Sequence, residues 1–203
     1  MNHAATKSLQ GEERDGFRFR GGHNAIDLPA TLQARLRPAP RELLNTPADL
    51  DRWLIAANLA GSAPNATFDD LTTAHQLREA IYALASAQLS MAPDVSEARQ
   101  ALNRVASGSP ATPVLRGDDT VELVGSAGAL LTTLAREAVL LFGGREAALI
   151  RQCASDTCTI FFIDSSRSGD RKWCSMSGCG NKAKVAEFRR RKRRMGPSRQ
   201  EPG

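Results

Sequence analysis

The amino-acid sequence predicts a mainly α-helical protein with two parts. The first is a helical N-terminal domain that includes a short β element, and the second is a small C-terminal module made of a β-hairpin and a helix. Apolar residues recur at spacings of three and four along most of residues 47–142, which is the period of helices that bury one face. All four cysteines fall within residues 153–179, shortly before a dense run of basic residues. We therefore expect a flexible leader at 1–16, a helical domain at 17–144, a small module at 150–195 and a disordered tail at 196–203.

The short β element lies at the start of the helical domain, after a leader without hydrophobic periodicity. Phe17 and Phe19 alternate with arginines, which predicts a short strand. After two glycines, residues 25–28 are expected to continue as a second short strand or a turn. His23 and His75 are single histidines without a partner pattern, so we expect each to have a surface or capping role.

Helix signals become strong in the middle of the chain. Thr46 can cap a helix whose first turn contains Pro47. A second helix is expected to start at Asp69 or Asp70, and a third to span residues 96–105, both with apolar residues at helical spacing. The expected core residues of these three helices are Leu50, Trp53, Leu54, Ala57, Leu71, Ala74, Leu77, Ile81, Leu84, Ala85, Ala98, Ala101, Leu102 and Val105.

The last part of the helical domain combines a hairpin with an apolar helix. Residues 114–115 and 121–124 flank a polar turn, which predicts a β-hairpin. Residues 126–142 form the most apolar helix, and two glycines end it. No stretch approaches the roughly 18 uninterrupted apolar residues that a membrane span requires. The expected buried residues of this helix are Leu130, Leu134, Val139, Leu141 and Phe142.

Charge is distributed unevenly along the chain. The formal net charge is +5, but residues 182–203 alone hold nine basic and two acidic residues, so the rest of the chain is mildly acidic at −2. The N-terminus has no apolar segment followed by a small-residue cleavage site, which argues against secretion by a signal peptide. We therefore expect a cytoplasmic protein, where thiols stay reduced and clustered cysteines are more often metal ligands than disulfides.

The cysteines are spaced as two Cys-x4-Cys pairs with fifteen residues between the pairs. Two pairs on separate turns can supply the tetrahedral set of thiolates that Zn²⁺ prefers, and a site with four cysteines is coordinatively closed. We therefore expect one structural zinc ion and no enzyme activity. The alternatives are buried thiols without a metal, disulfides, or a switch that releases zinc on oxidation. The expected ligands are Cys153, Cys158, Cys174 and Cys179.

The segments around the cysteines predict the shape of the module. Residues 159–163 are β-branched and aromatic, and residues 171–173 can return as the second strand of a hairpin. Residues 181–194 have a helix-forming composition, with Val185 and Phe188 on one side. A knuckle, a hairpin and a helix in this order resemble a treble clef, so we expect a treble-clef-like zinc finger. Because so small a module has few large apolar residues, its folding is expected to depend on the metal.

Several motifs add a family resemblance. Cys153-x4-Cys158, Arg171-Lys-Trp173-Cys174-Ser-Met176 and Cys179-Gly180-Asn181-Lys182 are similar to the CGNR zinc finger family, with Lys182 in place of the arginine in the family name. Arg41-Glu-Leu-Leu-Asn-Thr-Pro-Ala-Asp-Leu50 resembles the helical ABATE domain, described as a stress-induced transcription regulator, which usually precedes this finger. The resemblance implies a zinc-dependent, DNA-binding regulator whose N-terminal domain senses a signal or supports assembly.

The basic C-terminal end indicates the partner. Six consecutive basic residues, 189–194, suit the neutralisation of nucleic-acid phosphates. We expect DNA as the partner; the alternatives are an RNA-binding or protein-interaction module stapled by zinc, or a solvated tail. The sequence specifies neither a homodimer nor a small-molecule effector, and it excludes neither. The expected nucleic-acid contacts are Arg167, Arg171, Lys172, Asn181, Lys182, Lys184, Arg189, Arg190, Arg191, Lys192, Arg193 and Arg194.

Overall fold

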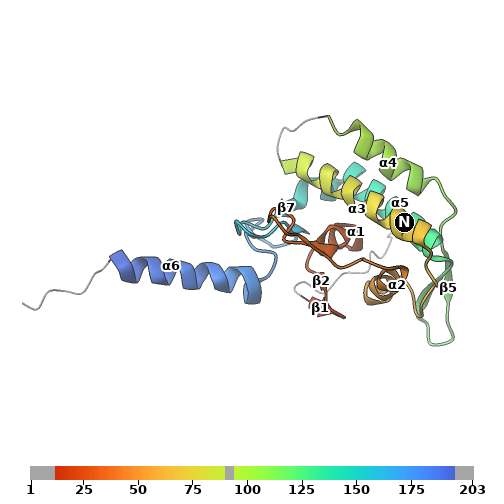
Figure 1. The fold of residues 1–203 in the computed structure, drawn as a ribbon, viewed down its shortest axis with the longest axis horizontal. Coiled ribbons are helices and arrows are strands. Elements are labelled where there is room, and N and C mark those ends of the chain that lie inside the picture. The colour runs from red at the N-terminus through yellow and green to blue at the C-terminus, as the bar shows by residue number, and fades with distance from the viewer. Residues whose placement is uncertain (1–11, 90–93, 195–203) are drawn as a thin grey trace, which may run out of the picture.

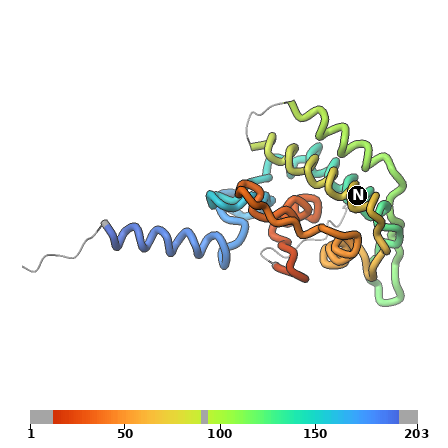
Figure 2. Tube along the Cα trace, viewed as in Figure 1, coloured from red at the N-terminus to blue at the C-terminus, as the bar shows by residue number. Residues whose placement is uncertain are grey.

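The computed structural model describes residues 12–89 and 94–194, and it is mainly α-helical, as the sequence predicts. Figure 1 shows a body of packed helices from which one helix projects, and Figure 2 traces the chain through the body into this last helix. The longer helices are α2 (Pro47–Ala56), α3 (Phe68–Leu89), α4 (Ser96–Ala106), α5 (Ala127–Gly143) and α6 (Asn181–Arg194). Shorter helical segments are α1 (Asn24–Asp27), η1 (Leu28–Thr31), η2 (Arg145–Leu149) and η3 (Met176–Gly180).

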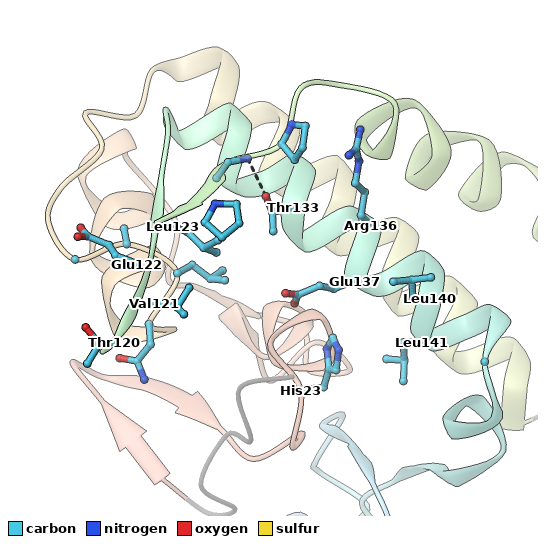
Figure 3. Close-up of a pocket in the computed structure, with 18 of the residues that line it drawn as sticks. His23, Thr120, Val121, Glu122, Leu123, Thr133, Arg136, Glu137, Leu140 and Leu141 are labelled. Carbon is cyan, nitrogen blue, oxygen red and sulfur yellow. Dashed lines mark hydrogen bonds between the residues drawn. The ribbon is translucent and has the colours of Figure 1, made fainter. Parts of the chain in front are cut away.

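The strands of the described residues form four separate antiparallel pairs. These are β1 (Glu12–Arg14) with β2 (Phe17–Phe19), β3 (Leu32–Gln33) with β4 (Arg41–Glu42), β5 (Thr112–Leu115) with β6 (Val121–Val124), and β7 (Ile150–Gln152) with β8 (Phe161–Ile163). The β5–β6 pair confirms the hairpin predicted there, and it faces α5 across a hollow (Figure 3). No helix in the described part of the chain is long and apolar enough to cross a membrane.

Side-chain caps explain where the helices begin. The Thr46 hydroxyl accepts a hydrogen bond from the Asp49 amide, and the Asp49 carboxylate accepts one from the Thr46 amide, which together make a capping box. Thr67 and Asp70 form the same reciprocal pair at the start of α3. Ser126 caps α5. These signals are local in sequence, and the three predicted helix starts are confirmed to within two residues.

The helices of the body surround one hydrophobic core. Trp53 of α2, Leu77 of α3 and Leu134 of α5 are fully buried in it, while α4 packs against α3 and α5 and buries mainly Leu102. The predicted inward faces of α2 and α3 are therefore confirmed. The predicted burial of Val139 is wrong, since this residue is 36% exposed. Val139 lies five positions after Leu134, which places its side chain about 140° away around the helix.

The leader contains more structure than predicted. Residues 12–14 form β1, because Asp15 and Gly16 both adopt positive φ angles and so make the two-residue turn of a β-hairpin. The Arg52 guanidinium pairs with the Asp15 carboxylate at 2.8 Å and ties this hairpin to α2. Residues 1–11 and the predicted tail at 196–203 lie outside the described residues.

The segment after β2 is helical, so the strand or turn predicted for residues 25–28 is wrong. His23 Nδ1 accepts a hydrogen bond from the Ala25 amide and caps α1, which confirms its predicted capping role, although its side chain is buried. The buried Asp27 carboxylate accepts hydrogen bonds from the amides of Arg20 and Gly21 at 2.8 and 2.6 Å. The loop that these hydrogen bonds close, residues 20–27, leads into helix α1 where a second strand or turn was predicted.

The hairpin of the C-terminal module also differs from the prediction. Residues 171–173 form no strand, and β8 pairs instead with β7, which precedes the first cysteine pair. The first pair thus sits in the turn of the hairpin, where the Cys153 amide donates to the Ile160 carbonyl at 3.0 Å. The Arg171 amide donates to the buried Asp164 carboxylate at 2.9 Å. The Asp164 side chain therefore closes the loop between residues 164 and 171, where the sequence predicted hydrogen bonds between two strands.

β7 and β8 pack into the same core as the helices of the body. Ile150, Phe161 and Ile163 belong to that core, and the Phe161 ring lies against Tyr82 of α3 with 5.3 Å between ring centroids. The Ile163 amide donates to the Gly21 carbonyl at 2.8 Å. The helical part and the C-terminal module therefore share one hydrophobic core, although the sequence predicts a domain boundary between residues 144 and 150.

Candidate metal centre

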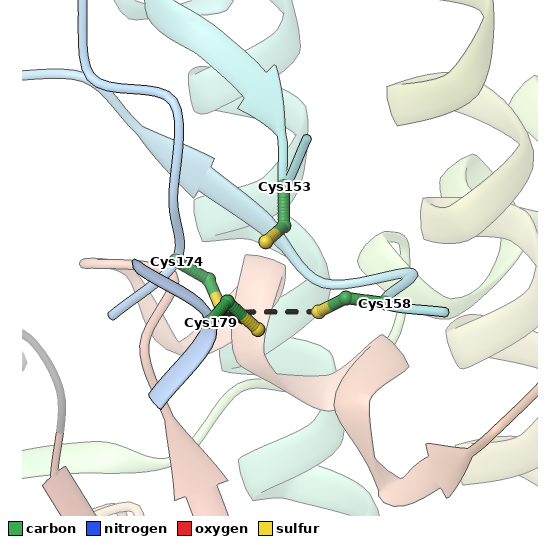
Figure 4. Close-up of side chains that lie close together, drawn as sticks. All are labelled: Cys153, Cys158, Cys174 and Cys179. Carbon is green, nitrogen blue, oxygen red and sulfur yellow. Dashed lines mark hydrogen bonds between the residues drawn. The ribbon is translucent and has the colours of Figure 1, made fainter. Parts of the chain in front are cut away.

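Four cysteine side chains gather around one point (Figure 4). Their sulfur atoms all lie within 4.8 Å of one another, and Cys158–Cys174 and Cys174–Cys179 are each separated by 3.8 Å. A tetrahedral zinc ion with Zn–S bonds of about 2.3 Å holds its sulfurs about 3.8 Å apart. A disulfide would need about 2.05 Å. The arrangement therefore fits four ligands of one zinc ion and is not a pair of disulfides.

Two short knuckles position the ligands. Cys153 follows β7 directly, and the Cys158 amide closes the first knuckle by donating to the Ser155 carbonyl at 2.8 Å. Cys179 lies inside η3, five residues after Cys174, and the Gly180 amide donates to the Ser175 carbonyl at 2.9 Å. The wide π-type turn of η3 thus brings the second pair together and leads without a break into α6.

The thiols are strongly coupled to one another. Hydrogen bonds from the Cys158 and Cys174 thiols lower the pKa of Cys153 to about 2. The hydrogen bond with Cys153 raises the pKa of Cys158 to about 12, and hydrogen bonds with Cys153 and Cys158 raise the pKa of Cys174, since a second thiolate would be repelled by the first and partly desolvated. Four thiolates are stable together here when a multivalent cation neutralises them, which Zn²⁺ does.

Comparison with known families agrees with this geometry. Residues 150–192 match the family described as "CGNR zinc finger", and residues 22–145, more than half of the chain, match ABATE, described as "Putative stress-induced transcription regulator". The chain belongs to the ABATE family. It carries a CGNR zinc finger at its C-terminal end, and the four clustered cysteines of that finger hold one structural zinc ion. A comparison with individual curated proteins found no match.

The metal centre of the CGNR finger is shielded by apolar groups. Cys174 and Phe162 are fully buried, and Ala30 of η1 packs into the same small cluster together with Ile160 and Cys153. Ala30 comes from the ABATE domain, so the two family regions meet at the zinc ligands. Exclusion of water on this side strengthens the attraction between the metal and its thiolates.

The glycine of the CGNR sequence element lies in a tightly packed turn. A Cβ atom at Gly180 would lie 3.0 Å from Met176 Sδ and 3.2 Å from Trp173 Cδ1. The turn of η3 therefore closes tightly over the indole ring. A side chain at this position would push the ring or the Met176 side chain away from the second knuckle.

Arg171 and Asp164 brace the CGNR finger from inside, a role that the sequence analysis missed. The Arg171 guanidinium donates to the carbonyls of Trp173 and Cys174 at 2.9 and 2.6 Å and lies over the Phe162 ring. Burial is the main cause that lowers the pKa of Arg171, and the charge of Cys174 opposes it. Arg171, which was predicted to contact nucleic acid, is therefore bonded to groups inside the finger, even though the polar loop before it predicts an exposed side chain.

The remaining predicted nucleic-acid residues lie on the surface. Arg167 and Lys172 are exposed on the loops of the finger, and the cations of α6 are exposed along the helix from Lys182 to Arg193. The side chain of Arg194 lies outside the part of the chain that can be described. Figure 1 shows α6 leaving the body, and it packs mainly against η3. The structure therefore gathers these residues on one projecting helix and its base.

Five of the cations of α6 fall into two groups. Glu187 pairs with Arg190 and Arg191, three and four residues further along the helix. Lys182, Arg189 and Arg193 are spaced by seven and four residues, so they share another face of the helix. No ion pair among the described residues involves this second group, which we call the unpaired basic face.

Proposed function

We propose that this ABATE-family protein is a zinc-dependent transcription regulator whose CGNR finger binds duplex DNA through α6. The observation that supports it most directly is the unpaired basic face of a helix that starts two residues after a zinc ligand and projects from the body. The regulatory description of the ABATE family is consistent with this role. The closed set of four thiolates supports a structural and not a catalytic metal, because it leaves no open coordination position.

The dimensions of α6 suit a groove of duplex DNA. The helix has 14 residues and therefore spans about 20 Å, and the major groove is wide enough to admit one α-helix. Asn181 and Lys182 at its start can reach base edges, while later arginines can neutralise phosphates. Lys182 takes the place of the arginine in the family name, so it contributes charge without the planar fork of a guanidinium.

Aromatic residues favour duplex over single-stranded nucleic acid. Binding of single strands usually relies on exposed aromatic rings that stack on bases. In the described part of the finger, Phe161 and Phe162 are buried and Trp173 is half-buried beside the metal site, which leaves Phe188 as the exposed ring. A single ring on α6 does not make a stacking platform.

The test is the salt dependence of DNA affinity, measured by fluorescence anisotropy with a random-sequence duplex. Each phosphate neutralised contributes about 0.9 to the slope of log K against log salt concentration. The variant K182A/R189A/R193A is expected to lower that slope by about 2 to 3 and to weaken binding strongly at low salt. Its control is R37A/R41A/R104A, which removes three exposed cations from the body and causes the same change in net charge.

Three results would contradict the proposal. They are a flat salt slope for the unmodified protein, equal losses in the two triple variants, and a clear preference for structured RNA over duplex DNA. A strong chelator is expected to abolish binding and added zinc to restore it, because the metal fixes the start of α6.

A further inference from the structure

A second feature of the structure lies mainly in the ABATE domain. It is a cavity of about 1080 Å³ between α5, the β5–β6 hairpin, the loop at residues 58–61 and the start of α1 (Figure 3). Pockets that bind small molecules typically measure about 300 to 1000 Å³ and have mostly apolar walls with few polar groups. The size of this cavity therefore suits a whole small molecule with room for water.

One carboxylate stands without a partner inside this cavity. Glu137 extends from α5 toward the β5–β6 hairpin, and its carboxylate points into the hollow (Figure 3). No hydrogen bond or ion pair within the described ranges, 12–89 and 94–194, reaches it. Burial raises the pKa of Glu137, and no nearby cation offsets this effect. A carboxylate that has lost water without gaining a donor is stabilised by a ligand that brings one.

The other charged side chains around the cavity either bond to groups other than Glu137 or lie at the mouth of the cavity. Arg136 donates to the carbonyls of Ala106 and Gly108, each at 2.9 Å. Arg116 forms an ion pair with Glu122. At the mouth, Arg145 and Glu146 are exposed neighbours of opposite sign. Among the charged side chains of the lining, Glu137 is therefore the one that is largely buried and has no bonded partner within the described residues.

His23 adds a polar but uncharged group to the wall. Its Nδ1 accepts the capping hydrogen bond of α1, and burial lowers its pKa, opposed by the charge of Glu146. At neutral pH the ring is therefore uncharged and does not compensate Glu137. Its other nitrogen carries the proton, because Nδ1 acts as an acceptor.

The walls also expose apolar surface that a ligand can cover. Val121 of the hairpin is 68% exposed and Leu140 of α5 is 63% exposed, and both line the cavity together with Leu123 and Leu141. Large apolar side chains left exposed around a concave surface are typical of binding sites. The occupant should therefore combine an apolar body with a group that bonds to Glu137.

We propose that this cavity binds a small organic cation, an amine or amidine on a hydrophobic body, with its charged group bonded to Glu137 and its apolar part against Val121 and Leu140. This site is separate from the nucleic-acid surface on α6, and the proposal does not depend on DNA binding. It assigns to the ABATE domain a ligand class defined by charge and shape.

The test uses three probes that share a phenylalkyl body and differ in charge: 2-phenylethylamine, 2-phenylethanol and 3-phenylpropanoate. Their binding to the full-length zinc-loaded protein is measured by calorimetry at neutral pH. The amine is expected to bind saturably and more tightly than the alcohol, and the anion is expected to bind least. E137Q keeps the shape of the side chain and is expected to weaken the amine about tenfold or more while leaving the alcohol nearly unchanged.

The matched control is E146Q, which removes the same charge at the mouth of the cavity and is expected to change the affinity for the amine by no more than about twofold. E137Q should also unfold at the same temperature or higher, since it removes a carboxylate without a partner. The proposal is overturned if the amine shows no saturable binding at millimolar concentration, if the anion binds as tightly as the amine, or if E137Q and E146Q weaken the amine equally.

Discussion

Removal of zinc is expected to unfold α6 while the body of the protein stays folded. Cys179 lies inside η3, which continues directly into α6, so the metal fixes the backbone of the turn from which the helix propagates. Without that turn, α6 is an isolated helix of 14 residues with six consecutive cations at its end. Isolated helices of this length are marginal in water, and like charges destabilise them further.

The magnitude follows from the cost of helix nucleation. A nucleation constant of about 10⁻³ corresponds to about 4 kcal/mol, which the zinc-bound turn removes from the folding of α6. Amide hydrogens in the first turns of α6 should therefore exchange up to about a thousandfold faster after chelation. The increase in exchange rate should be smaller near the C-terminal end of α6, where helix ends fray even with zinc bound. β7 and β8 should change little, because Ile150, Phe161 and Ile163 are buried in the core of the body.

Hydrogen exchange with mass spectrometry measures this directly, on the full-length protein with zinc, with a chelator, and after zinc is restored. Peptides from α3 and α5 serve as internal controls, because both helices pack in the core away from the metal. The reasoning is refuted if α6 keeps its protection after verified zinc loss. It is also refuted if α3 and α5 lose protection together with α6, since the shared core would then depend on the metal.

Three further changes test the packing. A30L is expected to accelerate zinc release to a chromogenic chelator, because Ala30 packs among the ligands. A56L, equally buried in α2, should destabilise the body by a similar amount, about 1–3 kcal/mol, without faster zinc release. Equal rates of zinc release from the two variants would contradict this. For Glu42, burial raises the pKa, but hydrogen bonds from buried Arg78 and a backbone amide outweigh burial and lower it. Its contribution to stability is therefore present above the ordinary pKa of 4.5 and is lost as pH falls, so E42Q should flatten the acid limb of a denaturation curve. T46A should cost about 1 kcal/mol of unfolding free energy in urea, because it removes the capping box of α2.

The features that could be predicted from sequence are those with local signals. The starts of α2, α3 and α5 follow from caps such as Thr46 and Ser126, and the inward faces follow from helical spacing. The cysteine ligands follow from spacing alone, because two pairs on separate turns can close a tetrahedron. The turn at Asp15-Gly16 was also readable as a hairpin signal, but the polar composition around it obscured the strands.

The features that could not be predicted depend on contacts between distant segments. From sequence, β8 could pair with a strand on either side; in the structure it pairs with β7, and the Arg171 amide bonds to Asp164 instead of to a strand. Arg171 looks like the other basic residues in sequence, and only the fold shows that its guanidinium bonds to the carbonyls of the second knuckle. The cavity around Glu137 combines side chains from four separate segments, so no single stretch of sequence contains its signal.

One short segment, residues 20–31, links the parts of the molecule. The Gly21 carbonyl accepts a hydrogen bond from Ile163 of the finger, His23 lines the cavity, and Ala30 packs against the zinc ligands. The closed loop around Asp27 holds this segment in one conformation. The finger is therefore attached to the body through its hairpin and through the buried cluster that Ala30 forms with Cys153 and Cys174, while α6 packs mainly on η3, the turn that contains the last zinc ligand. This division places α6, the helix that we propose binds DNA, on the part of the fold whose stability we expect to depend most directly on zinc.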